Sequence, residues 1–389
     1  MLENKKTLNA DWRNVKFGDV VRQCKEKADP ESSGLDRYIA GDHMDTDDLR
    51  IRRWGAIGSG YLGPAFHMRF RPGQVLYGSR RTYLRKVAIA NFEGICANTT
   101  FVLEPKNPNE LLPEFLPFLM QTEAFNAFSV QNSKGSVNPY INFSDLAQFE
   151  FNLPPKDKQT SLVQTLTEIE ENLESMELLS ATAESLRRSL MVDHYEASHL
   201  KNQRVSEIGN WHSGGTPSRG NPDFWGGHIP WVSPKDMKTS ELDSAEETLT
   251  AKGVEAGSKL MPKDTIMLVV RGMILAHTFP VARTLVPSAF NQDMKALVVS
   301  DEYRAKYIQY WFEYAAPQYL RLVSESSHGT KRLESDKLFS LSVPKPSLDE
   351  QDNFISQVDA VRTVINKAKA RHMDTLKMKR FFLNQHLAS

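Results

Sequence analysis

The chain has 389 residues, a formal net charge of zero and 25% charged residues. This length predicts two or three domains, each large enough to bury a core. No stretch approaches the roughly 20 apolar residues of a membrane span, and residues 1–11 lack the apolar centre of a secretory signal. The two cysteines, Cys24 and Cys96, have no neighbouring Cys or His ligands, which excludes a disulfide framework and a zinc site as expectations. We therefore expect a protein of the reducing cytoplasm with no membrane partner.

One succession of short motifs occurs twice in the chain, about 190 residues apart. Residues 70–75 (FRPGQV) correspond to residues 260–265 (LMPKDT), and Lys134-Gly135 corresponds to His328-Gly329. Residues 151–155 (FNLPP), followed by Gln159, correspond to residues 341–346 (LSVPKP), followed by Gln351. The spacing is far longer than the roughly 20–50 residues of a solenoid repeat. The duplication therefore predicts two similar domains.

Each repeat has the pattern of a mixed α/β globule. In the first repeat, short β-type runs at residues 75–77, 87–90 and 99–103 precede a helical stretch at 113–130. In the second repeat, β-type runs at 265–270 and 295–299 precede a helical stretch at 301–324. Many loops connect these elements, and loops on a rigid scaffold commonly carry binding residues.

A long amphipathic helix ends each repeat. The first helix has apolar residues at steps of three or four, as in a heptad seam: Leu162, Leu166, Ile169, Leu173, Met176, Leu179, Ala183, Leu186 and Leu190. The second has Phe354, Val358, Val361, Ile365, Ala368, His372, Leu376 and Leu383. Each helix is expected to span about 35 residues, or about 50 Å. Asp157 and Asp349, near the starts, suit a cap or complement the helix dipole.

The charges of the two helices predict that the helices pair with each other. Glutamates dominate the first helix between residues 168 and 184, and lysines and arginines dominate the second between 362 and 380. Charge favours pairing within one chain, and a pseudo-twofold arrangement of two repeats makes the pair antiparallel. The expected fold class is α/β (mixed α+β), with two similar globular domains separated by two long antiparallel helices that form an intramolecular coiled coil. We expect the globular domains at residues 1–154 and 199–346, and the helices at 155–198 and 347–389.

A run of basic residues without acids lies between Leu49 and Ala90. Tyrosines, one tryptophan and glycine-rich turns are interleaved with its nine bases: Arg50, Arg52, Arg53, Arg69, Arg71, Arg80, Arg81, Arg85 and Lys86. Such a mixture suits a surface that follows phosphates and contacts bases. The alternative is a solvated basic face whose charge is balanced by acids elsewhere in the chain.

Residues Ser213 to Met237 (SGGTPSRGNPDFWGGHIPWVSPKDM), followed by the Pro262-Lys263-Asp264 turn, resemble the start of a target-recognition domain in the specificity subunits of type I restriction-modification systems. The order of domain, long helix, domain, long helix also resembles that family, and the resemblance covers essentially the whole chain. It implies a non-catalytic subunit that binds double-stranded DNA, each recognition domain contacting one half of a split site. It further implies two methyltransferase subunits docked on the helices, and restriction/translocase subunits in the larger complex. S-adenosylmethionine, ATP and Mg²⁺ would belong to those partners, with no cofactor or metal in this chain.

Enzyme motifs are weak in this sequence. Asn138-Pro139-Tyr140 lacks the second proline of an adenine methyltransferase motif and has no glycine-rich cofactor loop upstream, so a turn is the preferred interpretation. No phosphate loop of the GxxxxGK[ST] type and no HExxH motif is present. Two other classes stay open at this point: a single-chain DNA methyltransferase or endonuclease fragment, and a coiled-coil adaptor that binds only protein.

The candidate DNA contacts come from loops of both repeats. In the first repeat they are Ser79, Arg80, Arg81, Tyr83, Arg85 and Lys86, together with Lys134 and Asn138 beside the Gly135 turn. In the second repeat they are Ser218, Arg219, Lys235, Arg271 and Gln292, together with His328, Lys331 and Arg332. Arginine pairs in a bidentate manner with guanine, and the other side chains suit phosphates.

Overall fold

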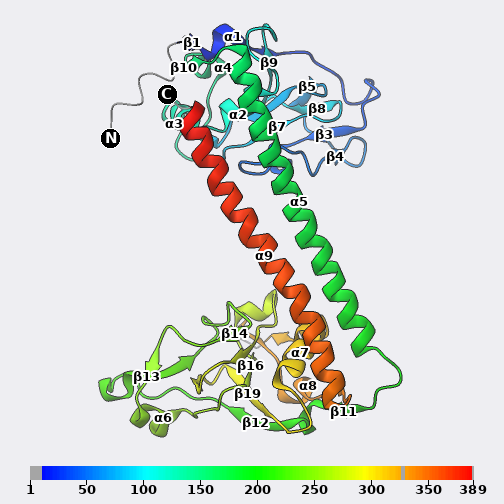
Figure 1. Ribbon diagram of the computed structural model, residues 1–389, viewed down its shortest axis with the longest axis vertical. Helices are drawn as coiled ribbons and strands as arrows, with labels where there is room; N and C mark the ends of the chain where they lie inside the picture. Colours follow the sequence, from blue (N-terminus) through cyan, green and yellow to red (C-terminus); the bar gives the residue numbers. More distant parts are fainter. Residues whose placement is uncertain (1–10, 326–328, 388–389) are drawn as a thin grey trace. The chain divides into compact units, whose positions relative to one another are not determined.

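The computed structural model describes residues 11–325 and 329–387, and the chain divides into two compact units (Figure 1). Unit 1 contains the residues up to Glu177 and those from Lys369 onward; unit 2 contains Leu178–Ala368. His328, one of the expected DNA contacts, lies outside the described residues. Within the described ranges, no helix is long and apolar enough to cross a membrane.

Unit 1 contains two four-stranded sheets and a two-stranded ribbon. The first sheet has the order β2 (Val21–Cys24), β9 (Thr100–Pro105), β6 (Val75–Gly78), β7 (Val87–Ile89). The second has the order β4 (Gly55–Ala56), β3 (Arg37–Ile39), β8 (Gly94–Ala97), β5 (Phe66–Phe70), and β1 (Arg13–Lys16) pairs with β10 (Glu150–Leu153). The short helices are α1 (Phe17–Val20), η1 (Gly41–His43), η2 (Thr82–Leu84), α2 (Phe115–Met120), α3 (Glu123–Gln131) and α4 (Phe143–Leu146).

The first sheet of unit 1 is buried on both faces. Tyr77 and Leu103 point toward a core that α2, α3 and the long helices complete, and Leu76 and Val102 point toward the second sheet. Period-two alternation between two apolar layers explains why these strands are almost wholly apolar. The predicted strands are confirmed, but the single helix expected at 113–130 is wrong. It is two helices, because the buried Thr122 side chain accepts a hydrogen bond from Phe125 N and starts α3 afresh.

Unit 2 repeats this plan with a larger principal sheet. Its strands are ordered β12 (Gly209–Ser213), β19 (Met294–Val299), β16 (Ile266–Val269), β17 (Val281–Thr284), β14 (Glu241–Leu242). The smaller sheet has the order β15 (Thr248–Leu249), β13 (Trp225–Val232), β18 (Ala289–Phe290), and two ribbons pair β11 (Asn202–Arg204) with β22 (Ser342–Pro344) and β20 (Ser324–Glu325) with β21 (Lys331–Arg332). The helices are η3 (Val205–Glu207), η4 (Pro222–Phe224), α6 (Ala251–Gly257), η5 (Met273–Ala276), α7 (Ala305–Leu322) and α8 (Ser335–Leu338).

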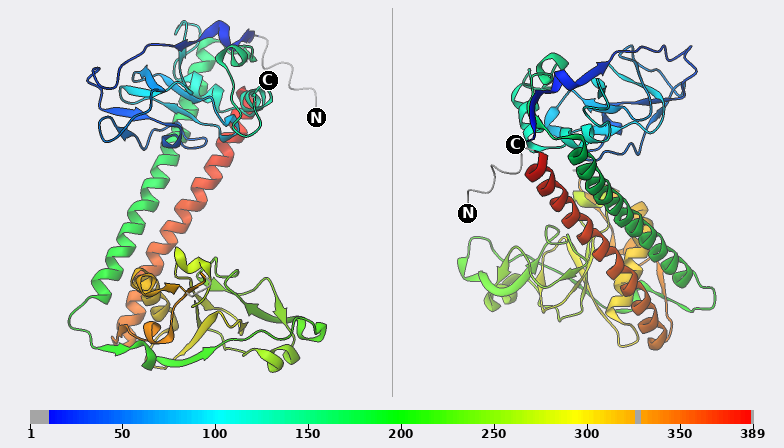
Figure 2. Two further views of the ribbon diagram at one scale, coloured as in Figure 1. Left: turned by 180° about the vertical axis from the view of Figure 1, so that it is seen from behind. Right: turned by 45° about the horizontal axis from the view of Figure 1, so that its top comes forward.

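The core of unit 2 lies between its principal sheet and α7. Ile266 and Leu268 on β16, and Tyr307 and Phe312 on α7, are fully buried in it. Figures 1 and 2 show β13 and α6 at the end of this unit away from α9. The predicted helix at 301–324 is confirmed as α7, with bounds two to four residues inside the expected ones.

Both long helices are confirmed, and each has 40 residues: α5 (Lys156–Tyr195) and α9 (Leu348–Leu387). In unit 1, Glu170 of α5 pairs with the buried Lys379 of α9. In unit 2, the rings of His194 on α5 and Phe354 on α9 stack with centroids 4.0 Å apart. Since the residue number rises along one helix as it falls along the other, the two helices are antiparallel.

The seam of α5 differs from the expected one in unit 2. Leu179 and Leu186 are 45% and 51% exposed, so their placement on the seam is wrong. The buried line follows Ala183, Met191 and Tyr195 instead, with Arg187 between them in an ion pair with Glu313. Periodicity alone predicts that Leu186 faces inward. Here Arg187 faces inward instead, because Glu313 on α7 pairs with it.

The start of α9 agrees with the second of the two roles expected of Asp349, which complements the helix dipole and is not the cap. Ser347 accepts a hydrogen bond from Glu350 N, and the Glu350 carboxylate accepts one from Ser347 N at 2.8 Å. This is a capping box, so Ser347 is the cap and Asp349 lies in the first turn, where its charge complements the helix dipole.

One buried glutamine joins each long helix to its globular part. Gln159 is fully buried; its amide donates to Glu110 O and Pro154 O, and its oxygen accepts from Leu112 N, all at 2.8–2.9 Å. Gln351, 192 residues later, is also fully buried and makes the same three bonds, to Glu302 O, Pro346 O and Arg304 N, at 2.8–3.1 Å. The two sets of partners have the same offset of 192, so the duplication extends to individual hydrogen bonds.

Replacing Gln159 should destabilise unit 1 strongly. Gln159→Ala leaves one part-buried N–H and two carbonyls, one buried and one part-buried, without this partner. We expect a loss of about 2–4 kcal/mol in the free energy of unfolding. Urea unfolding followed by circular dichroism measures the loss. Gln164→Ala, on an exposed position of the same helix, is the matched control and should change stability by less than about 0.5 kcal/mol. Equal effects of the two substitutions would contradict the role given to Gln159.

Candidate nucleic-acid interface

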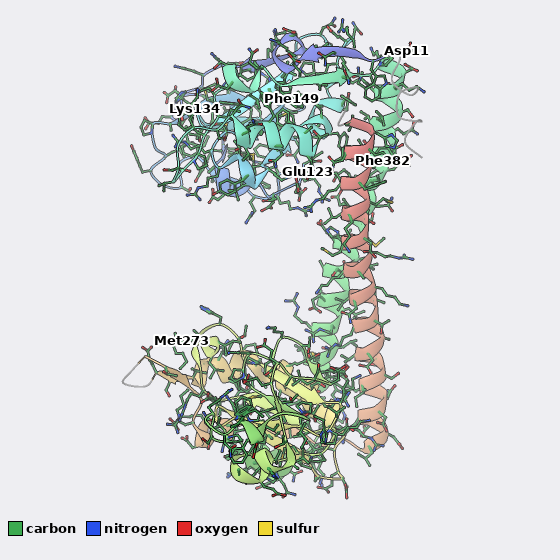
Figure 3. The ribbon with its side chains drawn as sticks, turned by 90° about the vertical axis from the view of Figure 1, so that its left-hand side faces the viewer. Asp11, Glu123, Lys134, Phe149, Met273 and Phe382 are labelled. Atoms are coloured by element: carbon green, nitrogen blue, oxygen red, sulfur yellow. The ribbon has the colours of Figure 1, made fainter. Side chains whose placement is uncertain are left out.

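A turn and a hairpin are joined by backbone hydrogen bonds at one end of β6 in unit 1. The chain leaves β6, passes through residues 79–81 and enters η2. Arg81 N donates to Pro139 O at 2.6 Å, and Ile141 N donates to Ser79 O at 3.0 Å. Lys134 and Tyr140 exchange two backbone bonds that close the hairpin. We call residues 79–84 with 134–140 the unit 1 loop pair. Figure 3 shows Lys134 at the end of this unit away from Phe382 on α9.

Unit 2 contains the same arrangement. The chain leaves β16, passes through residues 270–272 and enters η5, and the β20–β21 ribbon lies beside it. Gly272 N donates to Lys331 O at 3.0 Å, and Leu333 N donates to Val270 O at 2.9 Å. We call residues 270–276 with the described part of 324–332 the unit 2 loop pair. Because these hydrogen bonds match those of unit 1, Arg81 is equivalent to Gly272, and Arg80 is equivalent to Arg271.

Two arginines of the unit 1 loop pair carry charge that no acid neutralises. Arg80 and Arg81 are exposed, and neither forms an ion pair with any described residue. The Arg80 guanidinium lies 5.9 Å from the centroid of the Tyr140 ring, and Arg81 Nε donates to Asn138 Oδ1 at 3.1 Å. Tyr83 is 53% exposed beside them. These contacts orient the two guanidinium groups and leave N–H donors for a ligand.

The other three candidates near η2 have internal partners. Ser79 is 5% exposed and its hydroxyl donates to Thr99 O at 2.7 Å. Arg85 pairs with Asp47 at 2.7 Å and with Glu123 at 2.6 Å. Lys86 Nζ donates to Gly41 O. These residues hold the loop in place, and their side chains are not available in this conformation.

Most of the basic run between Leu49 and Ala90 is neutralised in the same way. Its arginines outside the loop pair bond to acids that precede or follow the run: Arg50 and Arg52 to Asp48, Arg53 to Asp45, Arg69 to Glu93, and Arg71 to Glu26. The expectation of one continuous basic surface is therefore too broad. The balanced-face alternative holds for these arginines. Among the described residues, the bases of the run that pair with no acid are Arg80, Arg81 and Lys86, and Lys86 is directed to the Gly41 carbonyl.

The hairpin of unit 1 carries a neutralised lysine. Lys134 Nζ lies 2.8 Å from Asp145, whose hydrogen bond and charge raise the pKa of Lys134. Asn138 accepts from Arg81, and Pro139 O accepts from Arg81 N, so the Asn-Pro-Tyr sequence forms a turn here, as preferred above.

The exposed Tyr140 and the 91% exposed Val137 of this hairpin were not among the residues predicted from the sequence. Tyr140 could have been found from the duplication, because an offset of 192 residues relates it to the predicted contact Arg332.

The unit 2 loop pair combines charge with exposed apolar side chains. Arg271 lies 4.0 Å from Asp293, Lys331 pairs with Glu325, and Arg332 lies 3.0 Å from Glu334. Met273, labelled in Figure 3, is 62% exposed on η5. This surface is thus less basic than that of unit 1, although its backbone is the same.

The remaining candidates of unit 2 lie on other loops. Arg219 stacks over Trp225 and Trp231, at 4.1 and 5.1 Å from the ring centroids, and bonds to Glu247 at 2.9 Å. This arginine holds the pKa of Glu247 below its usual value. Ser218 is exposed and its carbonyl accepts from Trp225 Nε1. Lys235 is exposed and forms no ion pair with the described residues, and Gln292 accepts from Thr216.

The chain belongs to the family described as type I restriction modification DNA specificity domain, which matches residues 9–184 and 198–372. It is similar to the specificity subunit of the type I restriction enzyme EcoR124I/EcoR124II of Escherichia coli, with 32% identity over 57% of this chain and 58% of that protein. It is also similar to the MjaIX specificity subunit of Methanocaldococcus jannaschii, with 29% identity over 44% of this chain and 39% of that protein. The chain thus covers less than two thirds of the length of either relative.

Solved structures share the fold. The S subunit of a type I restriction-modification system from M. genitalium has a TM-score of 0.60 and 15% identity, and the match covers 99% of this chain and 98% of that one. A chain from a study of complex assembly and conformational transition of the type I R-M system has a TM-score of 0.61 and 17% identity, over 96% and 97% of the two chains. No group of three or more His, Cys, Asp or Glu side chains suited to a metal ion occurs among residues 11–325 and 329–387.

The turn of the unit 2 loop pair depends on glycine. Gly272 has φ 135° and ψ 159°, a region that is essentially restricted to glycine. An added Cβ would contact only Ile274 Cγ2, at 4.0 Å, so Gly272→Ala should cost about 1–3 kcal/mol through the backbone alone. Urea unfolding measures this, with Gly220→Ala as the control, since Gly220 has neither a positive φ nor a close neighbour. A loss for Gly272→Ala no larger than for Gly220→Ala would contradict the assignment.

Proposed function

We propose that this chain is the non-catalytic specificity subunit of a type I restriction-modification complex and binds a bipartite double-stranded DNA site. The observation that carries the proposal is the loop pair, which the same hydrogen bonds build in each unit. Family membership of both repeats and the specificity-subunit relatives support it. Each unit contacts one specified DNA segment, and the two segments flank a stretch whose sequence is free.

The proposed DNA contacts differ in rank according to their internal partners. Arg80, Arg81 and Arg271 lie on equivalent turns and make the principal contacts, to bases or phosphates. A second group lies on the same loop pairs or on other loops and makes further contacts: Tyr83, Lys134, Asn138, Ser218, Arg219, Lys235, Gln292, Lys331 and Arg332. Ser79, Arg85 and Lys86 support the loop from inside.

Partners supply the chemistry in this proposal. Two methyltransferase subunits bind S-adenosylmethionine and methylate the site, and restriction/translocase subunits use ATP and Mg²⁺. This chain scaffolds them through its long helices. The two alternatives have a direct test: sequence-specific methylation or cleavage by the purified chain alone would favour the single-chain enzyme, and an assembly that never binds DNA would favour the protein-only adaptor.

Removing one loop arginine should weaken DNA binding in a way that depends on salt. For a phosphate contact, Arg80→Ala or Arg81→Ala lowers the slope of log affinity against log salt by about 0.9. For a base contact, the loss is about 1–3 kcal/mol and one position of the target is relaxed. Fluorescence anisotropy of the assembled methyltransferase complex on labelled DNA, at several salt concentrations, measures both.

Arg71→Ala is the matched control for these two substitutions. Arg71 belongs to the same basic run, but its guanidinium bonds to Glu26 at 2.8 Å. We expect its replacement to leave DNA affinity unchanged. If Arg80→Ala and Arg81→Ala behave like Arg71→Ala, the unit 1 loop pair does not contact DNA.

Exchange of one globular domain should change one half of the target. Replacing residues 1–154 by the equivalent domain of another family member should alter one specified segment, because each unit has its own loop pair. Sequencing of methylated bases in cells that carry the complex identifies the target. Exchange of residues 199–346 is the reciprocal control and should alter the other segment. A continuous target, or one exchange that rewrites both segments, would contradict independent recognition.

A further inference from the structure

An apolar groove with an acidic rim lies in unit 1, away from the loop pair. Ile51, Val75 and Phe118 form its floor and are 1–6% exposed. Glu114 at the start of α2 and Glu171 on α5 stand on the rim. The volume of this unit 1 groove is about 390 Å³, enough for a long side chain and its neighbours.

The same place can be located in unit 2 through backbone hydrogen bonds. Ile89 N donates to Leu49 O at 2.7 Å, and Arg283 N donates to Ser240 O at 3.0 Å in the equivalent position. Hence Ile89 corresponds to Arg283. The glutamine bonds to Leu112 N and Arg304 N align the helices, so Glu114 corresponds to Lys306 and Glu170 to Arg362.

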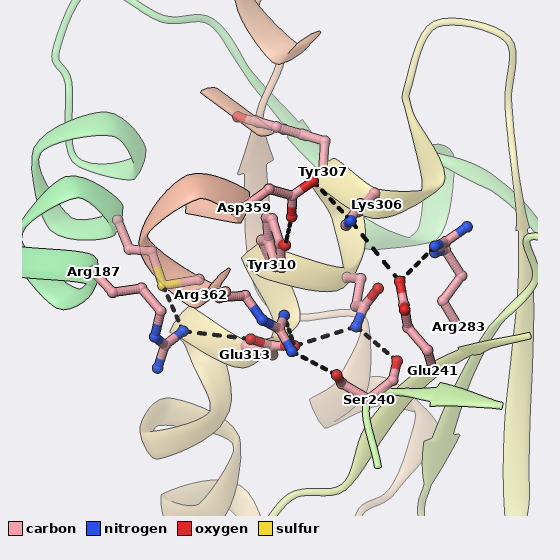
Figure 4. A network of polar contacts seen from close by, with 12 residues as sticks. Arg187, Ser240, Glu241, Arg283, Lys306, Tyr307, Tyr310, Glu313, Asp359 and Arg362 are labelled. Atoms are coloured by element: carbon pink, nitrogen blue, oxygen red, sulfur yellow. Dashed lines mark hydrogen bonds and ion pairs between the residues drawn. The ribbon is translucent and has the colours of Figure 1, made fainter. Parts of the chain in front are cut away.

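In unit 2 this place is filled by three basic side chains of the chain itself (Figure 4). Arg283 bonds to Glu241 at 2.7 Å, and Lys306 bonds to Asp359 at 2.8 Å. Arg362 donates to Ser240 Oγ at 2.6 Å and lies 3.3 Å from the largely buried Glu313. Each base thus meets an acid or a hydroxyl, and the three side chains are only 14–28% exposed.

Unit 1 has no base in the corresponding positions, since they hold Ile89, Glu114 and Glu170. Glu170 is paired with Lys379. Glu114 and Glu171 form no ion pair with any residue in the described part of the chain. Arg50, a base that also lines the groove, bonds to Asp48 at 3.0 Å and lies 3.8 Å from Glu174 and 3.4 Å from Glu177 of α5, so it leaves Glu114 and Glu171 without a partner. The groove therefore keeps an apolar floor and uncompensated carboxylates side by side.

We propose that the unit 1 groove receives a lysine or arginine side chain from an apolar segment of a partner protein. The apolar floor buries the methylene stem of that side chain, and the rim carboxylates bind its charged head. In unit 2, the charged heads of Arg283 and Lys306 pair with acids of the chain itself in the equivalent place. The acidic rim repels phosphates, so DNA is not the occupant. This inference rests on the proposed function in one respect: the partner chosen for the test is the methyltransferase subunit.

The first experiment tests the chemistry of the groove with small probes on the full chain. Agmatine carries the guanidinium of arginine at one end of a four-carbon stem and an ammonium group at the other, and 1-pentanol is a neutral control of similar length. With isoleucine δ-methyl labels, agmatine should shift Ile51 and Ile89 saturably, whereas Ile266 of unit 2 should not move. The double variant Glu114→Gln/Glu171→Gln should bind agmatine about fivefold more weakly, as expected for two exposed ion pairs. Equal shifts with pentanol, or equal agmatine affinity of the variant, would overturn the proposal.

The second experiment identifies the occupant in the assembled complex. A photo-crosslinking residue at Glu171 should capture a partner segment in which a lysine or arginine is flanked by apolar residues. Thr363 is the equivalent position on α9 and gives the matched control, which should capture no such segment. Filling the groove with Ile89→Arg/Glu114→Lys, the residues of unit 2, should abolish the capture while the urea midpoint is maintained.

The outcomes separate this inference from the proposed function. If the complex assembles and methylates DNA but Glu171 captures nothing, or a segment without a base, the groove proposal is wrong and the proposed function stands. If no complex forms with the methyltransferase subunit, the proposed function fails, and the agmatine titration alone decides on the groove.

Discussion

A single side chain in each unit determines where the long helix leaves the globular part. Three backbone groups meet there. They are the carbonyl that precedes the long helix, a carbonyl of the turn that precedes α2 or α7, and the N–H of the residue two positions after that second carbonyl. The amides of Gln159 and Gln351 satisfy all three in a fully buried position. A hydrogen bond of a buried side chain is costly to break because no water molecule replaces the lost partner. The helix entry, the start of α2 or α7 and the adjoining groove are therefore fixed together.

The duplication preserves backbone bonds more closely than side chains. A backbone N–H or C=O in the interior must be paired whatever the sequence, so the bonds of Arg81 N and Gly272 N recur although the two residues differ. Side chains on the same frame are free to diverge. This freedom places two unneutralised arginines on one loop pair and a neutralised set on the other. It also leaves one groove acidic and open where its counterpart is filled by Arg283 and Lys306.

The sequence was sufficient for the elements that repeat with a regular period. The long helices, the principal strands and the duplication were predictable because heptad steps and offsets are local or linear properties. Three features were not, because they depend on tertiary contacts: the break at Thr122, the inward position of Arg187, and the internal partners of Arg85. Counting bases between Leu49 and Ala90 could not reveal that acids just outside the run fold back onto it. Arg80 and Arg81 were among the predicted residues, yet the structure alone separates them from their neutralised neighbours.

The balance of charge bears on how such a chain meets DNA. Lysines and arginines number 48 and so do aspartates and glutamates, and many of the bases are held in ion pairs. Attraction to phosphates at distances beyond about 10 Å is then weak at physiological salt, since it depends on net charge and is screened. Under the proposed function, recognition by the loop pairs acts at contact distance, where the direction and complementarity of individual contacts count more than total charge. In the proposed complex, long-range attraction to DNA would therefore fall to the partner subunits. The proposed role of this chain is then the selection of the site, which its near-zero net charge does not oppose.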